Sequence, residues 1–326
     1  MKKFISIILP LRGLAALMVV LFHLFCLSNN YFTNETLLSI FRFGKYGIHI
    51  FFIISGFVIT YSLIDTKYTL NNVLQFFKKR IVRIEPPYIL TLLLCIVYSI
   101  LREFTPFYNG TSTIPDIWQV MLHLGYLIPF SGYPWINIVF WTLAIEFQFY
   151  LLFAIIYPLF RKKPLIRIIT YTGFISLHFF SPINDSNVLY YSPLFLVGII
   201  LALHINNIIK RDEFIFTCIT IATFTIYFLG LTIFLFQIFT SLIILFQPGI
   251  KSRLFNFLGK ISYSLYLIHT LIVFFIINIA HKLPSSIGAK VFVTIIAITA
   301  TIGISYLQYI FVEKPFIKLS KRIKYK

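Results

Sequence analysis

Apolar runs of sequence, each long enough to cross a lipid bilayer, recur along the whole chain and limit the folds open to it. A transmembrane helix needs about 20 predominantly apolar residues. Runs of this kind follow one another with short polar connections, and no segment is left for a sizeable soluble domain. Of the 326 residues, 59% are hydrophobic and 12% are charged, whereas about a quarter of a soluble domain is charged. We therefore expect an all-α polytopic membrane protein with a single transmembrane domain over residues 1–326.

Breaks rich in charge, proline or asparagine divide the chain into about ten predicted transmembrane helices. These predicted spans are 9–28, 45–64, 86–101, 138–160, 165–180, 189–207, 214–230, 231–247, 261–281 and 287–312. Gly230 is the only break in a run that could otherwise form one long tilted helix. The loop 102–137 holds an apolar stretch, 117–129, that is too short to span comfortably. We expect that stretch to be re-entrant or to lie against the outer surface.

The basic residues predict how the chain is oriented. An even number of spans places both termini on one side of the membrane, and most of the 28 lysines and arginines lie in the loops of that side. The positive-inside rule makes this side the cytoplasm. The net charge of +18 could suggest nucleic acid, but these residues stand at the ends of apolar runs and form no polyanion-binding face. A nucleic-acid partner is therefore not expected.

Neither cysteines nor a cleavage site point to a secreted or metal-binding protein. Cys26, Cys95 and Cys218 lie in or beside apolar runs without CxxC spacing, so we predict packing residues and neither a disulfide framework nor a metal site. The lysine-rich N-terminus and the apolar stretch after it could be taken for a signal peptide. Because no small-x-small cleavage site follows, we expect an uncleaved first span.

Arg12 and His23 are ionisable residues inside the first predicted span, where burial in hydrocarbon costs several kcal/mol. They are eleven residues apart, so both fall on nearly one helix face with about 16 Å of axial separation. Glu146 lies inside another span. Counted from the outer ends of their spans, the depths of Glu146 and His23 in the membrane are compatible. A carboxylate bonded to one imidazole nitrogen would make the other a general base. The alternatives are a snorkelling Arg12, a packing role for His23 and a structural pair for Glu146.

Arg80 and Arg83 stand before the prolines that open the predicted span 86–101. Their i,i+3 spacing turns both guanidinium groups the same way, which suits phosphate oxygens, although such clusters often serve only as topological anchors. Ser55 and Gly56 fall at mid-membrane depth, where small residues usually allow close helix packing. His269 lies deep enough in its span to face a cavity, and packing is its alternative role.

Taken together, these segments resemble the membrane-bound acyltransferase family 3, which includes bacterial O-acetyltransferases of surface polysaccharides. The first span of that family carries an arginine, ten intervening residues and a histidine, as Arg12 and His23 do. Ser55, Tyr88, Trp141 and His269 are further candidate site residues in the shared segments. In the family's order and over nearly the whole chain, the segments are Leu11-Arg12-Gly13 through His23, FFIISGF (51–57), Arg80-Ile-Val-Arg83 with the Pro-Tyr segment, FWTLAIEFQFY (140–150), ISYSLYLIH (261–269) and Glu313-Lys-Pro315.

The resemblance implies transfer of an acyl group, acetyl above all, from cytoplasmic acetyl-CoA to a hydroxyl of a surface polysaccharide or its lipid-linked precursor. It implies that His23 deprotonates the acceptor or relays the acyl group, and that Glu146 orients His23. Arg80 and Arg83 would hold the phosphates of CoA, and Arg12 would position the donor or stabilise developing negative charge. Family and topology together imply a bacterial inner membrane. Some members add an extracytoplasmic hydrolase-like domain, and none is expected here.

Two other classes of membrane protein have a similar composition. A secondary transporter also buries charged residues around a cavity, but the chain shows no paired interrupted helices in corresponding halves. A flippase or polymerase of polysaccharide precursors gives no reason for the arginine pair combined with the eleven-residue Arg/His spacing. Acyl transfer is therefore the function that we expect.

Overall fold

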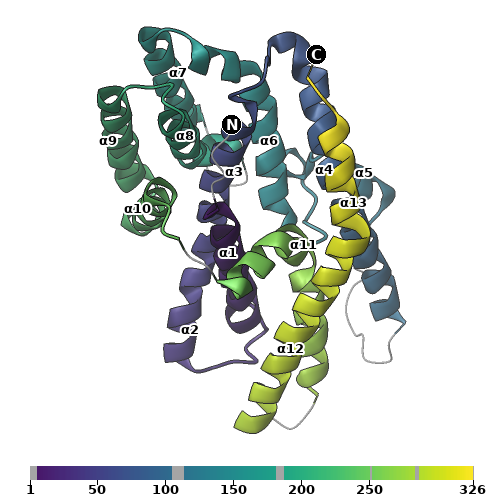
Figure 1. The fold of residues 1–326 in the computed structure, drawn as a ribbon. Coiled ribbons are helices and arrows are strands. Elements are labelled where there is room, and N and C mark those ends of the chain that lie inside the picture. Colours follow the sequence, from purple (N-terminus) through teal and green to yellow (C-terminus); the bar gives the residue numbers. More distant parts are fainter. Residues whose placement is uncertain (1–5, 105–113, 181–186, 250–251, 283–285, 326) are drawn as a thin grey trace.

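The computed structural model describes residues 6–104, 114–180, 187–249, 252–282 and 286–325, and in these ranges all regular secondary structure is helical. Figure 1 shows the helices packed side by side as a bundle. In chain order the helices are α1 (Ile8–Cys26), α2 (Glu35–Arg42), α3 (Gly47–Leu63), α4 (Val73–Glu103), α5 (Ile117–Leu124), α6 (Phe140–Ile156), α7 (Pro164–Ser176), α8 (Val188–Ile205), α9 (Arg211–Phe228), α10 (Leu231–Phe246), α11 (Arg253–Ala280), α12 (Ile287–Gln308) and α13 (Lys314–Arg322). A π-helical turn, Tyr309–Glu313, joins α12 to α13.

Seven helical segments of the described chain are long and apolar enough to cross a membrane. They are Ile8–Cys26, Glu35–Leu63, Leu70–Glu103, Phe140–Arg161, Val188–Ile205, Arg253–Ala280 and Ile287–Arg322. The other three predicted spans are helices as well: two are shorter, Pro164–Phe180 and Leu231–Phe246, and α9 begins with three charged residues. The all-α polytopic architecture is thus confirmed, whereas ten crossings and their orientation remain predictions.

The break predicted at Gly230 is real. Helix α9 ends at Phe228, α10 begins at Leu231, and Gly230 has φ +92° between them. A positive φ of this size is open to glycine and costly for other residues. The run 214–247 therefore forms two helices and not one.

Helix α4 differs from its prediction. It begins at Val73, well before the expected start at residue 86, and it carries Pro86 and Pro87 inside the helix. Neighbouring helices supply hydrogen bonds to the backbone there: the Tyr263 hydroxyl donates to the carbonyl of Ile84 (2.9 Å) and Gln308 Nε2 donates to that of Pro87 (3.0 Å). Prolines are tolerated within membrane helices, and these contacts hold α4 against its neighbours on both sides of Pro86. Arg80 and Arg83 consequently lie within a helix and not at its mouth.

The apolar stretch 117–129 packs back against the bundle through α5 and the turn after it. Tyr88 donates a hydrogen bond to the carbonyl of His123 (2.9 Å), and Tyr126 donates to Glu85 Oε1 (2.8 Å). The Tyr126 ring stacks on Tyr88 and on Phe147. The segment therefore lies against α4 and α6, in keeping with the expectation of a re-entrant or peripheral stretch.

Glycines let two pairs of helices approach closely. A Cβ on Gly13 of α1 would lie 2.3 Å from the carbonyl oxygen of Phe255, and a Cβ on Gly259 of α11 would lie 1.9 Å from that of Leu9. The same holds where α3 crosses α8, since a Cβ on Gly56 would lie 2.1 Å from the carbonyl oxygen of Phe195. The packing role expected for Gly56 is thus confirmed, and α1 and α11 form one tightly joined pair (Figure 1).

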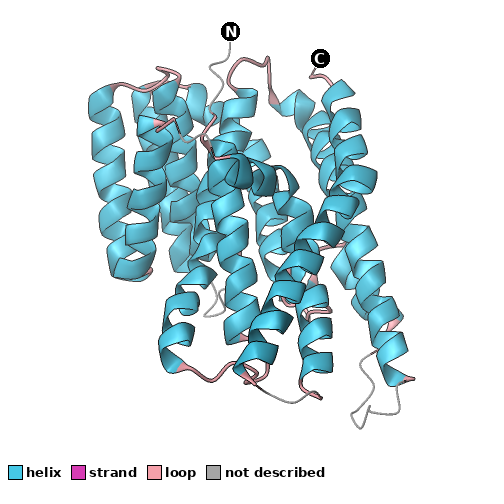
Figure 2. Cartoon of the chain, turned by 60° about the horizontal axis from the view of Figure 1, so that its bottom comes forward, coloured by secondary structure: helices cyan, strands magenta, loops and turns pink. Residues whose placement is uncertain are grey.

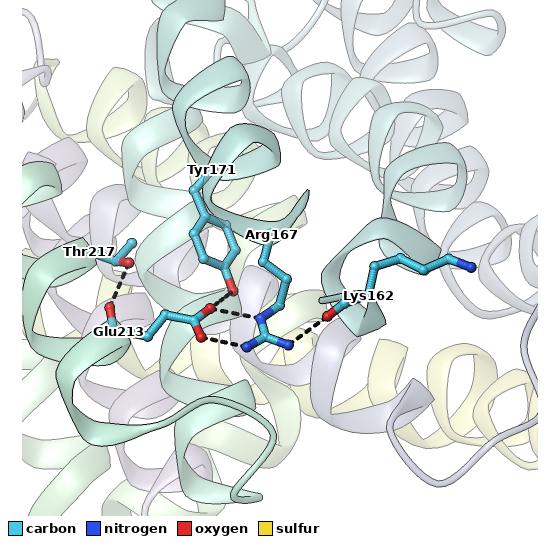
Figure 3. A network of polar contacts seen from close by, with 5 residues as sticks. All are labelled: Lys162, Arg167, Tyr171, Glu213 and Thr217. Carbon is cyan, nitrogen blue, oxygen red and sulfur yellow. Dashed lines mark hydrogen bonds and ion pairs between the residues drawn. The ribbon is translucent and has the colours of Figure 1, made fainter. Parts of the chain in front are cut away.

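An internal ion pair ties α7 to α9 (Figure 3). Arg167 donates from Nε to Glu213 Oε1 (2.7 Å) and from Nη2 to Oε2 (2.5 Å), while its Nη1 donates to the carbonyl of Lys162 (2.7 Å). Both charged side chains are 8% exposed. Two parallel bonds of this kind add a defined geometry to the attraction between the charges, so they fix the relative position of the two helices.

Candidate active site

A cavity opens between α1, α3, α4, α6 and α11 and reaches the π-helical turn. It holds about 920 Å³ of empty space, part of which is open to the surroundings. Its charged and polar walls come from segments far apart in the sequence, namely Arg12, Ser55, Arg80, Arg83, Thr142, Glu146, Tyr150, Ser262, Tyr263, Tyr266 and Glu313. The cavity thus gathers one or more residues from each of the six family-like segments.

Three arginines face the cavity with few protein partners. Arg12 Nε donates to Ser262 Oγ (3.0 Å), and Arg80 Nη2 donates to Ser62 Oγ (3.2 Å). Arg83 has no hydrogen-bond or ion-pair partner among the described residues, and Arg80 Nε is buried without one. Since each guanidinium carries five N–H donors, most donors at this cavity are unused.

The Arg80 guanidinium is held between aromatic rings. It lies 5.4 Å from the centre of the Phe76 ring and 5.7 Å from that of Tyr150. Such stacking orients the planar guanidinium and leaves its edge for an anion. The expectation that Arg80 and Arg83 turn to the same side is met, because both line the cavity.

Two carboxylates share the cavity with the arginines, and both are held by hydroxyl groups. Glu146 accepts hydrogen bonds from Ser55 Oγ (2.7 Å) and from the Tyr150 hydroxyl. Glu313 accepts from the backbone N–H (3.2 Å) and the hydroxyl (2.7 Å) of Ser264. Neither carboxylate forms an ion pair with an arginine in the described chain. The cavity therefore keeps three cations against two anions.

Glu313 was missed as a site residue because its predicted span ended at residue 312. The helical chain continues through residues 309–313 as a π-helix, and this turn carries Glu313 into the bundle, where it is 4% exposed. Single π-helical turns are rare and often occur at functional sites. The available signal was an acidic residue next to a long apolar run.

His23 lies apart from the residues that line the cavity and pairs with a second histidine. Its Nδ1 lies 2.8 Å from the carbonyl oxygen of Val19 and 3.2 Å from His269 Nε2. The expected hydrogen bond between His23 and Glu146 is therefore wrong. Helix ends do not lie in one plane, so depths counted from them do not compare two helices. Glu146 shares the cavity with Arg12, which precedes His23 by 11 residues in α1.

The shared face of Arg12 and His23 is confirmed, because both residues contact α11. Arg12 bonds to Ser262 and His23 bonds to His269. Together with the close approach of Leu9 to Gly259, these contacts advance along both helices in the same direction. Helices α1 and α11 are therefore parallel.

The remaining candidates divide between cavity and framework. Ser55 lines the cavity through its bond to Glu146. Tyr88 is 1% exposed and holds the α5 segment through His123, so its contacts are structural. Trp141 is half-buried with its ring 6.1 Å from that of Tyr191, outside the cavity. His269 is fully buried beside His23.

Residues 10–309 match the model of the acyltransferase domain family, the acyltransferase-3 type, and the chain belongs to that family. It is thus a multi-pass membrane acyltransferase. This membership favours acyl transfer over the transporter, flippase and polymerase alternatives.

Three relatives carry the comparison further. O-acetyltransferase OatA of Staphylococcus aureus is 27% identical over 94% of this chain, and the match spans 56% of OatA. Acyltransferase MdmB of Streptomyces mycarofaciens is 30% identical over 48% of this chain and 40% of its own length. An uncharacterized protein of Haemophilus influenzae is 32% identical over 60% of this chain and 96% of its own. No solved structure matches the chain.

Proposed function

We propose that the protein is an O-acyltransferase, specifically an O-acetyltransferase, that uses cytoplasmic acetyl-CoA. The acceptor would be a hydroxyl of a cell-surface polysaccharide or of its lipid-linked precursor, and the membrane the bacterial inner membrane. The observation that carries the proposal is the cavity in which Arg12, Arg80 and Arg83 leave most of their donors unused. OatA, by its name an O-acetyltransferase, supports the choice of the acyl group.

The arginine cavity suits the phosphates of CoA. Guanidinium groups bind phosphate through paired, charge-assisted hydrogen bonds, and Arg80 keeps a buried Nε without a partner. Arg80 and Arg83 would hold the phosphates, with Arg12 beside them. Glu146, fixed by Ser55 and Tyr150, can accept hydrogen bonds from the amides of the pantetheine arm. Under this proposal the nucleotide end of the donor would lie in the cavity and its arm would run along α1.

His23 is the proposed general base. The acceptor hydroxyl oxygen attacks the thioester carbonyl while its proton passes to an imidazole nitrogen of His23. The tetrahedral intermediate then collapses, the carbon–sulfur bond breaks, and the leaving thiolate takes that proton. The products are the acetyl ester and CoA. A positioned base of this kind contributes about 10²–10⁴ in rate.

The test uses membranes that contain the protein, labelled acetyl-CoA and the host's polysaccharide as acceptor. We expect His23→Ala to lose acetyl transfer by about 10² or more and to keep CoA binding. His204→Ala is the matched control, because this histidine stacks on Phe214, away from the cavity. Label transfer at the normal rate by His23→Ala would refute the proposed role of His23. NMR of the surface polysaccharide with and without the gene would identify the acyl group and acceptor together.

A further inference from the structure

His23 and His269 form a buried pair of imidazoles between α1 and α11. His23 is 5% exposed and His269 is 0% exposed. Their ring centres are 4.8 Å apart at an interplanar angle of 75°, and His269 Nε2 lies 3.2 Å from His23 Nδ1. The edge of one ring thus meets the other, in the geometry of a hydrogen bond and not of a stack.

The surrounding carbonyl groups leave one consistent placement of the protons. His269 Nδ1 lies 2.8 Å from the carbonyl oxygen of Tyr266, and His23 Nδ1 lies 2.8 Å from that of Val19. A carbonyl oxygen only accepts, so both Nδ1 atoms must carry hydrogen. His269 Nε2 is then the acceptor that faces the Nδ1–H of His23. The His23 Nδ1–H is shared between Val19 and His269.

This placement leaves His23 Nε2 as a lone pair without a partner in the described chain. This nitrogen is not fully buried, although His23 as a whole is only 5% exposed. The nitrogen that can take a proton is therefore the one that points away from His269.

We infer that His269 is a positioning residue for His23, holding its ring and stabilising the imidazolium that forms when Nε2 takes the acceptor's proton. The inference rests on the proposed role of His23 as base. Once His23 is positively charged, its Nδ1–H bond to His269 becomes charge-assisted and about twice as strong. His269 thus orients His23 as a carboxylate orients the catalytic histidine in other enzymes, but it adds no second charge to the apolar bundle.

A second contact holds His269 itself. Tyr266, whose carbonyl accepts from His269, joins its hydroxyl to Thr142 Oγ1 of α6 (2.6 Å). Tyr266 and Thr142 both line the cavity. The turn of α11 that carries His269 is therefore anchored to the cavity wall, which fixes the register between the base and the donor site.

The experiment compares His269→Gln with His269→Asn in purified protein. The amide of glutamine reaches the place of an imidazole Nε2, whereas that of asparagine reaches only the place of Nδ1. We expect kcat to fall about tenfold to a hundredfold in His269→Asn and His269→Phe, with most of it retained in His269→Gln. KM for acetyl-CoA and the Kd of CoA should stay unchanged in all three, because His269 does not line the cavity.

The outcomes separate this inference from the proposed function. Active His23→Ala protein would refute the proposed role of His23 as base, on which this inference rests. Inactive His23→Ala with normal kcat in His269→Phe would overturn only the role of His269. If His269→Phe fails to fold, an equal fall in kcat for the glutamine and asparagine variants overturns the inference in the same way.

Discussion

Each arginine of the cavity is kept as a free donor by its own surroundings. Arg80 lies between the rings of Phe76 and Tyr150, and Arg12 donates one N–H to Ser262. Arg83 has no hydrogen-bond or ion-pair partner among the described residues. None of the three forms an ion pair with a carboxylate of the described chain, and a cation removed from water without a counter-charge is costly, so binding of an anion would stabilise this site. The cost is consistent with a site built for a polyanionic ligand.

Arg83→Ala should weaken acetyl-CoA binding and leave the chemical step nearly intact. Losing charge-assisted hydrogen bonds worth about 1.5–3 kcal/mol raises KM and Kd by roughly 10–100-fold. Because the contact is the same in ground and transition states, kcat should change little. Steady-state kinetics with isothermal titration of CoA would measure both.

Lys78→Ala is the matched control, since it removes a positive charge from the same helix at an exposed position outside the cavity. A phosphate-free pantetheine thioester should be used with the same KM by Arg83→Ala and by the unaltered protein. An equal penalty for both donors would show that Arg83 does not read phosphate.

At the level of residues, the sequence predicted the members of the site better than their partners. Arg12, Arg80, Arg83 and Glu146 do meet in one cavity, because ionisable residues in apolar helices are buried only where a polar space receives them. The bond from Glu146 to His23 was wrong, and the His23–His269 contact was not foreseen. Partners across helices depend on tilt and rotation, which periodicity along one helix does not contain.

Among the helices, the crossing of α1 and α11 is the contact that sets the site. Gly13 and Gly259 bring the two backbones together, and Arg12 and Ser262 meet beside that crossing. Small residues at such crossings supply packing where lipid provides no hydrophobic drive between helices.

Gly13→Ala should destabilise the protein although alanine favours helices. Its Cβ would meet the backbone oxygen of Phe255 at 2.3 Å, so α1 must shift, and overpacking of this kind costs about 1–3 kcal/mol. Thermal unfolding in detergent, followed by activity after reconstitution, is the measurement.

Gly303→Ala provides the control in α12, where an added Cβ meets no atom within 4 Å. It should be neutral or stabilising by up to about 1 kcal/mol, since glycine disfavours helix interiors. Equal melting temperatures for the two variants would contradict the role given to the crossing.

Helices were predicted well where apolar runs end at clear breaks, and poorly where they do not. Gly230 separates α9 from α10 as expected. Helix α4, in contrast, already begins at Val73 and continues through Pro86 and Pro87. The π-turn that carries Glu313 inward has no signature in hydropathy. Both segments are held by contacts with other helices, namely the bonds to the carbonyls of Ile84 and Pro87 and the bonds from Ser264 to Glu313, and the hydropathy of one segment does not contain such contacts.

Across the whole molecule, the start of α1 and the end of α13 lie toward the same end of the bundle (Figure 2). Near that end Tyr325 packs against Tyr68 and Lys79. The basic loops predict that this end faces the cytoplasm. Arg12 lies early in α1 and His23 lies late in it, so the arginine cavity belongs to the half of α1 nearer this end.

This orientation can be tested with single cysteines in a cysteine-free background. Ser39→Cys in α2 should react with a membrane-impermeant maleimide on intact spheroplasts, because α2 follows the first span on the outer side. Lys321→Cys in α13 should react only after permeabilisation, since the predicted orientation puts it on the cytoplasmic side. Both residues are exposed, so access to the side chain does not differ. Labelling of both positions from the same side would refute an even number of crossings with cytoplasmic termini.

The parallel pairing of α1 and α11 also fixes the distance between Arg12 and His23. Arg12 and His23 are bonded to one partner helix, so their separation of about 16 Å is rigid. A donor whose phosphates are bound beside Arg12 can bring its thioester to His23 only if a flexible arm of matching length joins the phosphates to the thioester. Under the proposed roles, the enzyme would select acyl donors by the length of that arm, so that shortening the carrier would cost turnover even when every charge is kept.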